Sequence, residues 1–549
     1  MMKHTEQEEQ PVAVQGEPLE PVHSGNRPET DKESRSPEAA QGGNRPETNQ
    51  ESRQPEVSQG GNRPETDKGS RQPEAFQGGN RPETNQESRQ PEASQGGQQD
   101  ENKLAVMPVG KLLLSLAAPA IAAQIVNLLY NMVDRIYIGH IPGVGAMALT
   151  GLGVTLPVIM LVAAFASLIG FGGAPRASIA MGKGDYETAE KILGNCVFTL
   201  VCVAVALTVG FFVYAEPILY AFGASADTIG YAVPYMRIYV CGSICVLLTT
   251  GLNAFITSQG FASVGMKTVM IGAGLNIILD PLFIFGFHMG VKGAALATIL
   301  SQAVSAVWVV RFLCGPKTIL HIRKSNFGFR FKIMGPVLAL GVSPFIMQST
   351  ESLLSVCFNT SLQRYGGDIA VGAMTILASV MQFSMMPLQG LSQGMQPIVS
   401  FNYGANNMER VRKVFLLTLR CCLCYSLLIW GISMLFPEVL AQIFSSDGDT
   451  VEYTRWAMRI YMAASGIFGA QIACQQTFVA LGKAVHSLFL AVLRKIILLI
   501  PMIFILPLFF EDKVFAVFLA EPVSDTLAVV TTVTLFFTTA WRMMGRREA

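Results

Sequence analysis

From Lys111 onward, the sequence is a series of long apolar stretches separated by short polar segments. A helix that crosses the hydrocarbon core of a bilayer needs about 20 mainly apolar residues, and twelve stretches are long enough. They lie near 112–138, 146–172, 193–214, 231–257, 267–287, 291–314, 333–360, 367–395, 411–435, 454–480, 485–508 and 514–540. We therefore predict an all-α polytopic membrane protein with twelve transmembrane helices.

The charges predict how these helices are oriented. Basic residues gather after the second, sixth and eighth stretches and at the C-terminus, whereas the opposite connections are acidic or sparse in charge. Cytoplasmic connections carry the excess of Lys and Arg in membrane proteins. We expect a multi-pass protein of the cell (inner or plasma) membrane with both termini in the cytoplasm.

The N-terminal part of the chain differs in composition and charge. Residues 1–103 carry 12 Lys and Arg against 20 Asp and Glu, whereas the remainder carries 28 against 19. A GNRPET motif recurs there every 18 residues, and the repeats contain almost nothing apolar. Such a segment buries too little surface to offset its ordering entropy, so we predict a disordered low-complexity tail over 1–104. A tether or partner-binding segment and an expendable expansion both remain open as its role.

The apolar body repeats itself at a spacing of about 222 residues. Pro175 and Gly182 follow the second stretch, and Pro397 and Gly404 follow the eighth, each pair 222 positions apart. The motif MRIY opens both the fourth stretch and the tenth, again at this spacing. Six spans return the chain to its starting side, so the two copies share one membrane orientation. Parallel repeats of this kind are typical of transporters.

We accordingly expect two six-helix lobes, an N-terminal lobe over 105–325 and a C-terminal lobe over 326–549.

One carboxylate, Asp280, lies inside the apolar fifth stretch. A charged Asp at the centre of a membrane helix costs roughly 2.5–3.5 kcal/mol on insertion scales, and such residues usually face a cavity and mark an ion or proton path. Asn276 precedes it by one turn on the same helix face. The equivalent position in the eleventh stretch is Ile500, so only one copy of the repeat keeps this acid.

A second acid, Asp134, ends the first stretch and aligns with Asn359 in the seventh. Together with Asp280 it predicts an acidic cation or proton site in the N-terminal half. Because Arg135 follows it directly, Asp134 also fits an ion pair at the membrane interface.

Several motifs resemble one transporter family. They are the VD at the end of the first stretch, the NxxxDP of the fifth, and the Gly-rich cytoplasmic loops AMGKGDYETAEK and FNYGANNMERVRK after the second and eighth. With the two six-helix halves, they look like the multidrug and toxic compound extrusion (MATE) transporters, and most like the DinF-like, MepA-like branch. The resemblance covers about 105–545. It implies the MATE fold and drug export in exchange for H⁺ or Na⁺, with the cation bound in the N-terminal lobe.

The resemblance also implies roles for single residues. Asp134 matches the first-helix acid of the family, Asn276 and Asp280 match its fifth-helix pair, and Thr298 is similar in place to a hydroxyl that lines this site. Glu351 resembles an acid that other branches use in the C-terminal lobe. Its usual carboxylate partner in the tenth span is not evident, because that region holds Gln471, Gln475 and Gln476.

Further polar and flexible side chains inside the spans are candidates for the substrate cavity. Met381 and Met385 fit an adaptable apolar wall, and Glu351, Gln389 and Asn253 fit its polar contacts. Ordinary helix packing and interhelical hydrogen bonding are the alternative for each of them.

The function predicted from these features is secondary multidrug efflux of cationic or polar aromatic compounds by alternating access. We expect drugs or toxic organic cations and membrane lipid as partners, no nucleic acid, a monomer, and no cofactor or metal beyond the coupling H⁺ or Na⁺. An enzyme is disfavoured because the histidines are scattered, and direct coupling to ATP because no GxxxxGK[ST] motif occurs. A lipid-linked or polysaccharide flippase and a non-transporting receptor on the same fold remain as alternatives.

Overall fold

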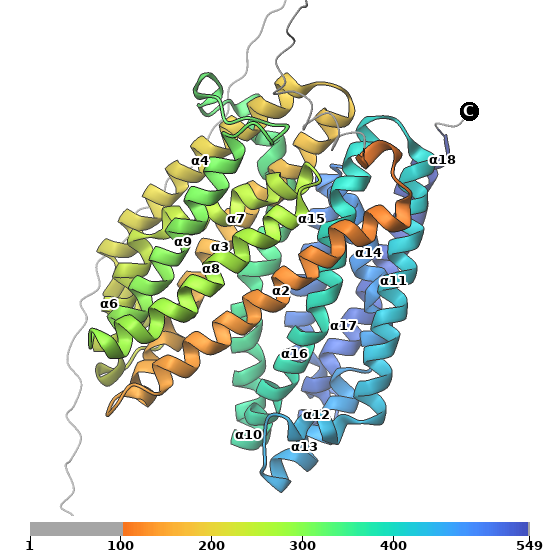
Figure 1. Ribbon diagram of the computed structural model, residues 1–549. Helices are drawn as coiled ribbons and strands as arrows, with labels where there is room; N and C mark the ends of the chain where they lie inside the picture. Colours follow the sequence, from red (N-terminus) through yellow and green to blue (C-terminus); the bar gives the residue numbers. More distant parts are fainter. Residues whose placement is uncertain (1–102, 547–549) are drawn as a thin grey trace, which may run out of the picture. The chain divides into compact units, whose positions relative to one another are not determined.

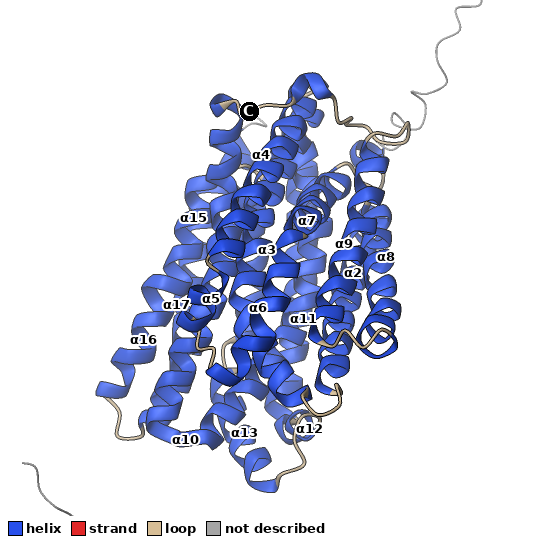
Figure 2. Cartoon of the chain, turned by 90° about the vertical axis from the view of Figure 1, so that its left-hand side faces the viewer, coloured by secondary structure: helices blue, strands red, loops and turns tan. Residues whose placement is uncertain are grey.

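The computed structural model describes residues 103–546, which are helical almost throughout (Figure 2). The tail predicted to be disordered lies outside the described residues, apart from its last two positions. Within the described part the chain forms helices joined by short turns and contains no strands. The predicted fold class, an all-α polytopic membrane protein, is confirmed.

The first half of the helical body supplies five helices of membrane-spanning length and one bent pair of helices, and Figure 1 shows their arrangement. Its elements are α2 (Val109–Gly139), α3 (Gly145–Gly182), α4 (Tyr186–Val213), α5 (Ala215–Ala221), α6 (Ala226–Cys241), α7 (Ser243–Ser258), α8 (Ala262–Pro281), the π-helix η2 (Leu282–Gly286) and α9 (Val291–Leu313).

The second half repeats this series after the short 3-10 helix η3 (Lys324–Asn326). Its elements are α10 (Phe331–Gly404), α11 (Met408–Leu435), α12 (Pro437–Gln442), α13 (Gly448–Tyr461), η4 (Ser465–Ile467), α14 (Phe468–Ala480), α15 (Ala484–Val492), η5 (Leu493–Leu499), α16 (Ile500–Ile505), η6 (Leu506–Leu508), α17 (Lys513–Phe536), η7 (Phe537–Trp541) and α18 (Arg542–Arg546).

These elements account for the twelve predicted spans. Nine helices of the described residues are long and apolar enough to cross a membrane, and the bent pair α6 and α7 makes ten. The 74-residue α10 holds two spans, because Gly367 at φ 66° interrupts it. The remaining span, the tenth, is formed by α13 with α14, and its first segment carries charges such as Asp449 and Arg455.

The fourth and tenth spans, which the sequence predicts as continuous, are each broken. In the fourth, α6 and α7 meet at Gly242 with a bend of 54°. A Cβ at Gly242 would lie 2.2 Å from the side chain of Ile299, so α9 packs directly against the bend. In the tenth, α13 ends at Tyr461 and α14 begins at Phe468. The two breaks occupy equivalent places in the repeat.

The Gly-containing segments after the second and eighth spans are mostly helical rather than loops. Only 183–185 and 405–407 leave the helices. In each turn the last residue caps the next helix: Asp185 accepts from the Thr188 N–H at 3.0 Å, and Asn407 from the Arg410 N–H at 3.1 Å. The helices therefore extend beyond the bilayer-length stretches on this side.

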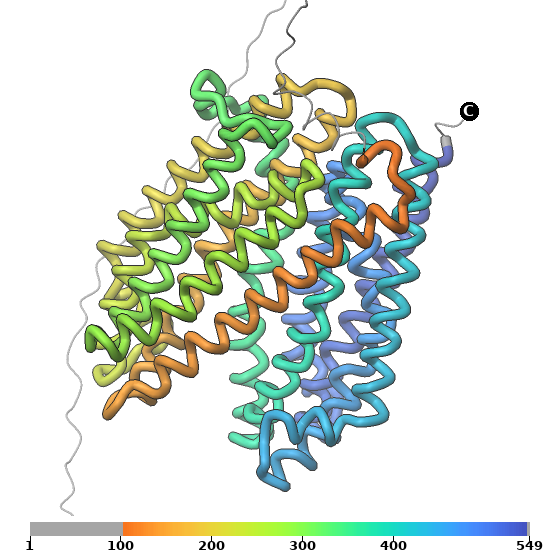
Figure 3. Tube along the Cα trace, viewed as in Figure 1, coloured from red at the N-terminus to blue at the C-terminus, as the bar shows by residue number. Residues whose placement is uncertain are grey.

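The two halves contact each other closely near the end that holds the start of α2 and the short helix α18 (Figures 1 and 3). A Cβ at Gly341 would lie 1.7 Å from the carbonyl oxygen of Leu168, and one at Gly182 would lie 2.0 Å from that of Phe401. Small residues permit this approach of two helix backbones. Toward the opposite end, the helices of the two halves spread apart in the figures.

One buried amide helps to fix the segment between the halves to the first half. Gln259 is fully buried, and its Oε1 accepts from the Thr318 hydroxyl at 2.9 Å and from the N–H groups of Ile319 and Leu320 at 2.8 Å each. The other end of its amide donates to the carbonyl of Phe255 at 3.0 Å. A single side chain thus satisfies three donors of the connecting segment.

Replacing Gln259 by Leu is expected to loosen this segment, because a buried donor left unsatisfied costs about 1–3 kcal/mol. The variant should unfold at a lower temperature in detergent and be cut faster by trypsin at Lys317 or Arg323. The exposed Gln442→Leu serves as the control. Equal melting temperatures and cleavage rates for the two variants would contradict an anchoring role of Gln259.

Candidate functional site

The fifth span places a polar pair inside the first half. Asp280 is fully buried and Asn276 is 2% exposed, one turn earlier on α8. The Asn276 amide donates to Asp280 Oδ1 at 3.1 Å and to the Thr298 hydroxyl at 3.5 Å. Thr298, on α9, donates in turn to the carbonyl of Ala294 at 3.0 Å. The i, i+4 spacing read from the sequence therefore produces a direct contact, and α9 supplies the third group.

Asp134 joins this pair from α2. Its carboxyl group lies close enough to interact with the carboxyl group of Asp280. Tyr130 on α2 and Tyr235 on α6 lie near both acids. Asp134 thus points into the lobe, while Arg135 is exposed, so the inward contact is favoured over the alternative of an interfacial ion pair.

Three acceptor oxygens of this cluster are buried without a hydrogen-bond donor. They are Asp134 Oδ1, Asp280 Oδ2 and Asn276 Oδ1. Buried oxygens are normally satisfied, and two carboxylates in contact repel each other unless a proton or a cation lies between them. The arrangement can therefore hold a proton or a small cation, and the loss of that charge leaves an unfavourable buried acid pair.

The candidate residues of the substrate cavity are not gathered in one place. Met385 packs against the main hydrophobic core, whereas Met381 packs against a second core built from α10, α13, α16 and α17. Asn253 donates to the carbonyl of Gly265 at 3.3 Å and so joins α7 to α8 within the first half. Gln389 is exposed on the second arm of α10. Asn253 thus makes the interhelical hydrogen bond given above as the alternative.

Glu351 has a partner that the sequence reasoning missed. Lys495 Nζ lies 2.9 Å from Glu351 Oε1, and beside it Arg494 binds Asp525 at 2.8 Å and Glu521 at 3.5 Å. The C-terminal half therefore contains its own ionic cluster, although Ile500 replaces Asp280 at the equivalent position. The partner of Glu351 is thus a base from the eleventh span, whereas the resemblance implies a carboxylate in the tenth.

Two sequence signals pointed to this cluster. Glu521 and Asp525 are four residues apart in the apolar twelfth span, and Arg494 and Lys495 are adjacent in the eleventh. Adjacent residues of a regular α-helix lie about 100° apart around the axis. Arg494 and Lys495 belong instead to the π-helix η5, whose wider turn changes the angle between successive side chains, and both are buried.

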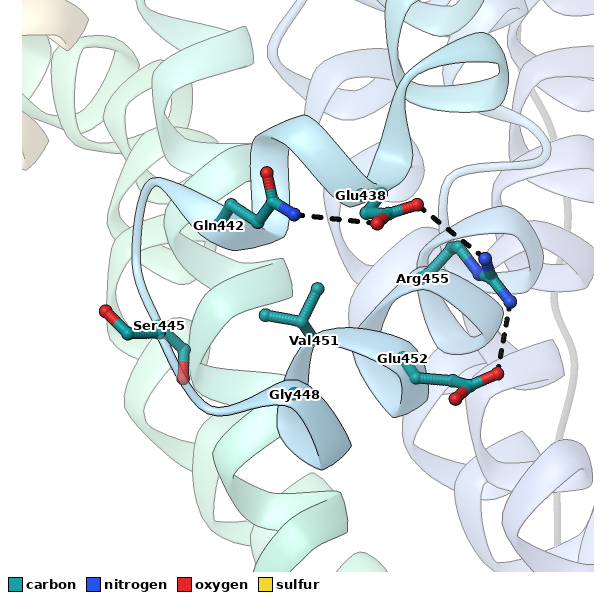
Figure 4. Close-up of a pocket in the computed structure, with 8 residues that line it drawn as sticks. Glu438, Gln442, Ser445, Gly448, Val451, Glu452 and Arg455 are labelled. Atoms are coloured by element: carbon teal, nitrogen blue, oxygen red, sulfur yellow. Dashed lines mark hydrogen bonds and ion pairs between the residues drawn. The ribbon is translucent and has the colours of Figure 1, made fainter.

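A surface pocket on the α12–α13 hairpin is a separate feature (Figure 4). In it Arg455 lies 3.7 Å from Glu438 and 3.2 Å from Glu452. These side chains are 42%, 53% and 79% exposed, and ion pairs at such exposure contribute about 0–1 kcal/mol. The pocket lacks the buried, unpaired oxygens that characterise the site around Asp280.

A helical body of two parallel six-span halves with buried acids inside the spans is typical of membrane transporters. The family assignment follows from a sequence model named MatE, which matches this chain twice, over 119–282 and over 344–505. The protein belongs to the MatE family. The two matches begin 225 residues apart and confirm the internal repeat, and the predicted resemblance to MATE transporters is confirmed.

Similar proteins and structures agree with this assignment. The multidrug export protein MepA of Staphylococcus haemolyticus (strain JCSC1435) is 22% identical over 423 residues, which are 76% of this chain and 92% of the relative. The protein of the same name from Staphylococcus aureus (strain MSSA476) is 23% identical over 410 residues, 73% of this chain and 87% of the relative.

Among solved structures, one described as MATE in the bent conformation aligns with a TM-score of 0.76 at 21% identity, covering 83% of this chain and 99% of that one. A structure described as the outward-facing conformation of a multidrug resistance MATE family transporter of the MOP superfamily gives 0.75 at 21% identity, covering 81% and 98%. These structural similarities show that this chain has the same fold as those proteins.

Proposed function

We propose that this protein is a multidrug efflux antiporter, which exports cationic or polar aromatic compounds in exchange for H⁺ by alternating access. The observation that carries the proposal is the cluster of Asp134, Asn276 and Asp280, with three buried oxygens that lack a donor. The names of the similar MepA proteins support the export of multiple drugs. Exchange with a cation is supported by the place of these acids inside membrane spans.

Protonation is the event that changes the first half. A proton on the Asp134–Asp280 pair removes net charge from a site of low dielectric and relieves the repulsion between the two carboxyl groups. The loss of charge weakens the attraction for a cationic substrate, and α2, which contains Pro119, is free to repack against α8. Deprotonation restores the acid pair and with it the affinity for the next substrate.

The membrane potential adds to this cycle. One elementary charge that enters across 100 mV supplies about 2.3 kcal/mol, which biases a two-state equilibrium roughly fifty-fold. The close contact of the halves around Gly341 and Gly182 supports one of the two end states, in which the end predicted to be cytoplasmic is closed. The other end state requires these backbones to separate.

Transport by the purified full-length protein in proteoliposomes tests the proposal and identifies the ion. A fluorescent organic cation loaded inside should leave faster when the outside is acidic, and a sodium gradient at equal pH should have little effect. Acceleration by sodium alone would identify Na⁺ as the coupling ion and overturn the proton-coupled form. A flux that neither gradient changes would overturn antiport altogether.

A further inference from the structure

The geometry points to a second exchange element in the C-terminal half. In it the Lys495 ammonium moves from Glu351 to Glu521 when Glu521 loses its proton, and the freed Glu351 carboxylate binds the cationic substrate. This inference rests on the proposed exchange of drug for protons and adds a second place where that exchange occurs.

The charges of the cluster are not balanced. Two cations, Arg494 and Lys495, face three acids, Glu351, Glu521 and Asp525. Four of the five are almost completely buried, with side chains 4–9% exposed. A surplus negative charge inside a membrane protein is costly, so the cluster is neutral when one acid carries a proton. The acid that carries the proton is the one with the weakest cationic partner.

Glu521 has the weakest partner. Arg494 holds Asp525 at 2.8 Å but Glu521 only at 3.5 Å. The guanidinium is also fixed over the ring of Phe468 on α14, with 4.3 Å to the ring centroid. Arg494 is therefore the stationary cation of the cluster. The group facing Glu521 from α13 is Tyr461, which carries no positive charge, so the other cation of the cluster is Lys495.

Lys495 is the cation that can change partner. It bonds to Glu351 at 2.9 Å, and it directly follows Arg494, whose guanidinium lies 3.5 Å from Glu521. A lysine has a flexible four-carbon stem and a compact charge, so its ammonium group can change partner by rotation of the side chain. Glu521 and Glu351 are thus alternative partners for the same ammonium group.

Glu351 lies where a substrate can reach it. Its side chain is 55% exposed, in contrast to the rest of the cluster. Its neighbours Gln348 and Ser352 contact α3 of the first half, at 2.8 Å to Ser167 and 3.4 Å to Met160. Residue 351 follows Gln348 by three positions, so it lies on the side of α10 that is turned toward the first half.

The exchange conserves charge in both states. In the first state Glu521 carries the proton, Lys495 neutralises Glu351, and Arg494 neutralises Asp525. In the second state the proton has left Glu521, Lys495 neutralises Glu521, and the substrate cation neutralises Glu351. No covalent bond other than the carboxylic O–H changes, and each bound monovalent cation releases one proton.

Proton release on ligand binding tests this inference. The full-length Asp134→Asn/Asp280→Asn variant is placed in nanodiscs in weak buffer with a pH-indicator dye, and tetraphenylphosphonium is added. Because this probe is permanently charged and has no proton to lose, every proton released comes from the protein. We expect about one proton per bound cation, and about tenfold tighter binding for each unit of rising pH where Glu521 titrates.

Adding Glu521→Gln or Lys495→Met to this background should abolish the release, whereas Lys495→Arg should retain it. Glu521→Gln should also weaken binding, since Lys495 then stays on Glu351. Unchanged proton release after Glu521→Gln, or no release from the background variant, would overturn the inference. Neither result would affect the proposed function, which is tested by pH-driven transport in proteoliposomes. If that transport were absent but the expected proton release occurred, this inference would still stand.

Discussion

Replacing Asp280 by Asn is expected to abolish drug resistance conferred by this protein in an efflux-deficient host, without lowering its abundance in the membrane. The amide keeps the shape of the carboxyl group and the hydrogen bond of Asn276, which lies 3.1 Å away. It cannot bind and release a proton, so the site loses its two charge states. The measurement is the minimal inhibitory concentration of an organic cation, together with quantification of the protein in isolated membranes.

Asp227→Asn is the matched control, because Asp227 is an exposed acid in the first turn of α6. Resistance should be near that of the wild type in this variant and near that of the empty host in Asp280→Asn. Near-normal resistance with Asn at 280 would remove Asp280 from the coupling step. Equal loss in both variants would point to a general effect of removing an acid.

Gly341→Ala is the second change for which we expect a large effect. The added Cβ would lie 1.7 Å from the Leu168 carbonyl oxygen, so one helix backbone has to move. Overpacking of this kind costs about 1–3 kcal/mol, which shifts a two-state equilibrium roughly 5- to 150-fold. The closed contact between the halves should be lost, and transport should fall with it.

A cysteine at position 178 reports this opening. Ser178 is fully buried on α3 and donates to the Pro397 carbonyl across the contact at 3.4 Å. In a background without the native cysteines, Ser178→Cys should react slowly with a polar maleimide, and much faster once Gly341→Ala is added. Gly372→Ala is the control, because Gly372 lies on α10 like Gly341 but a Cβ there has nothing within 4 Å. Identical labelling in both variants would show that Gly341 does not maintain the contact.

The span pattern and the acid site could be predicted from the sequence because both depend on local spacing. An apolar stretch of bilayer length leaves the backbone no alternative to a helix, and residues four apart on that helix must meet. Asn276 and Asp280 follow this rule. Their grouping with Thr298 and Asp134 rested mainly on the family resemblance, because the four residues lie on three separate helices, α2, α8 and α9.

The ionic cluster of the C-terminal half was missed for a physical reason. Its ion pairs join α10, η5 and α17, and no spacing within one helix reveals that Lys495 meets Glu351. The π-helix η5 also alters the phase that a regular helix would give to Arg494 and Lys495. The repeat aligns Ile500 with Asp280 and so indicates that the second copy lacks this acid. Two acids of the second copy, Glu521 and Asp525, instead lie on α17.

The breaks in the fourth and tenth spans were also hidden from hydropathy. Gly242 is a small residue in an apolar run, and its effect depends on Ile299 of α9, which fills the space a side chain would need. The repeat contained one usable signal, because the MRIY motif precedes both breaks, although Ala464 takes the place of Gly242 in the second copy.

The most direct test of proton antiport reverses the driving force. Purified protein is reconstituted at equal pH on both sides of the membrane, an organic cation is loaded on the inside alone, and a trapped dye reports the internal pH. We predict that the interior becomes acidic as the cation leaves, and that Asp280→Asn abolishes this acidification. Export of the cation by the wild type with no change in internal pH would contradict the account.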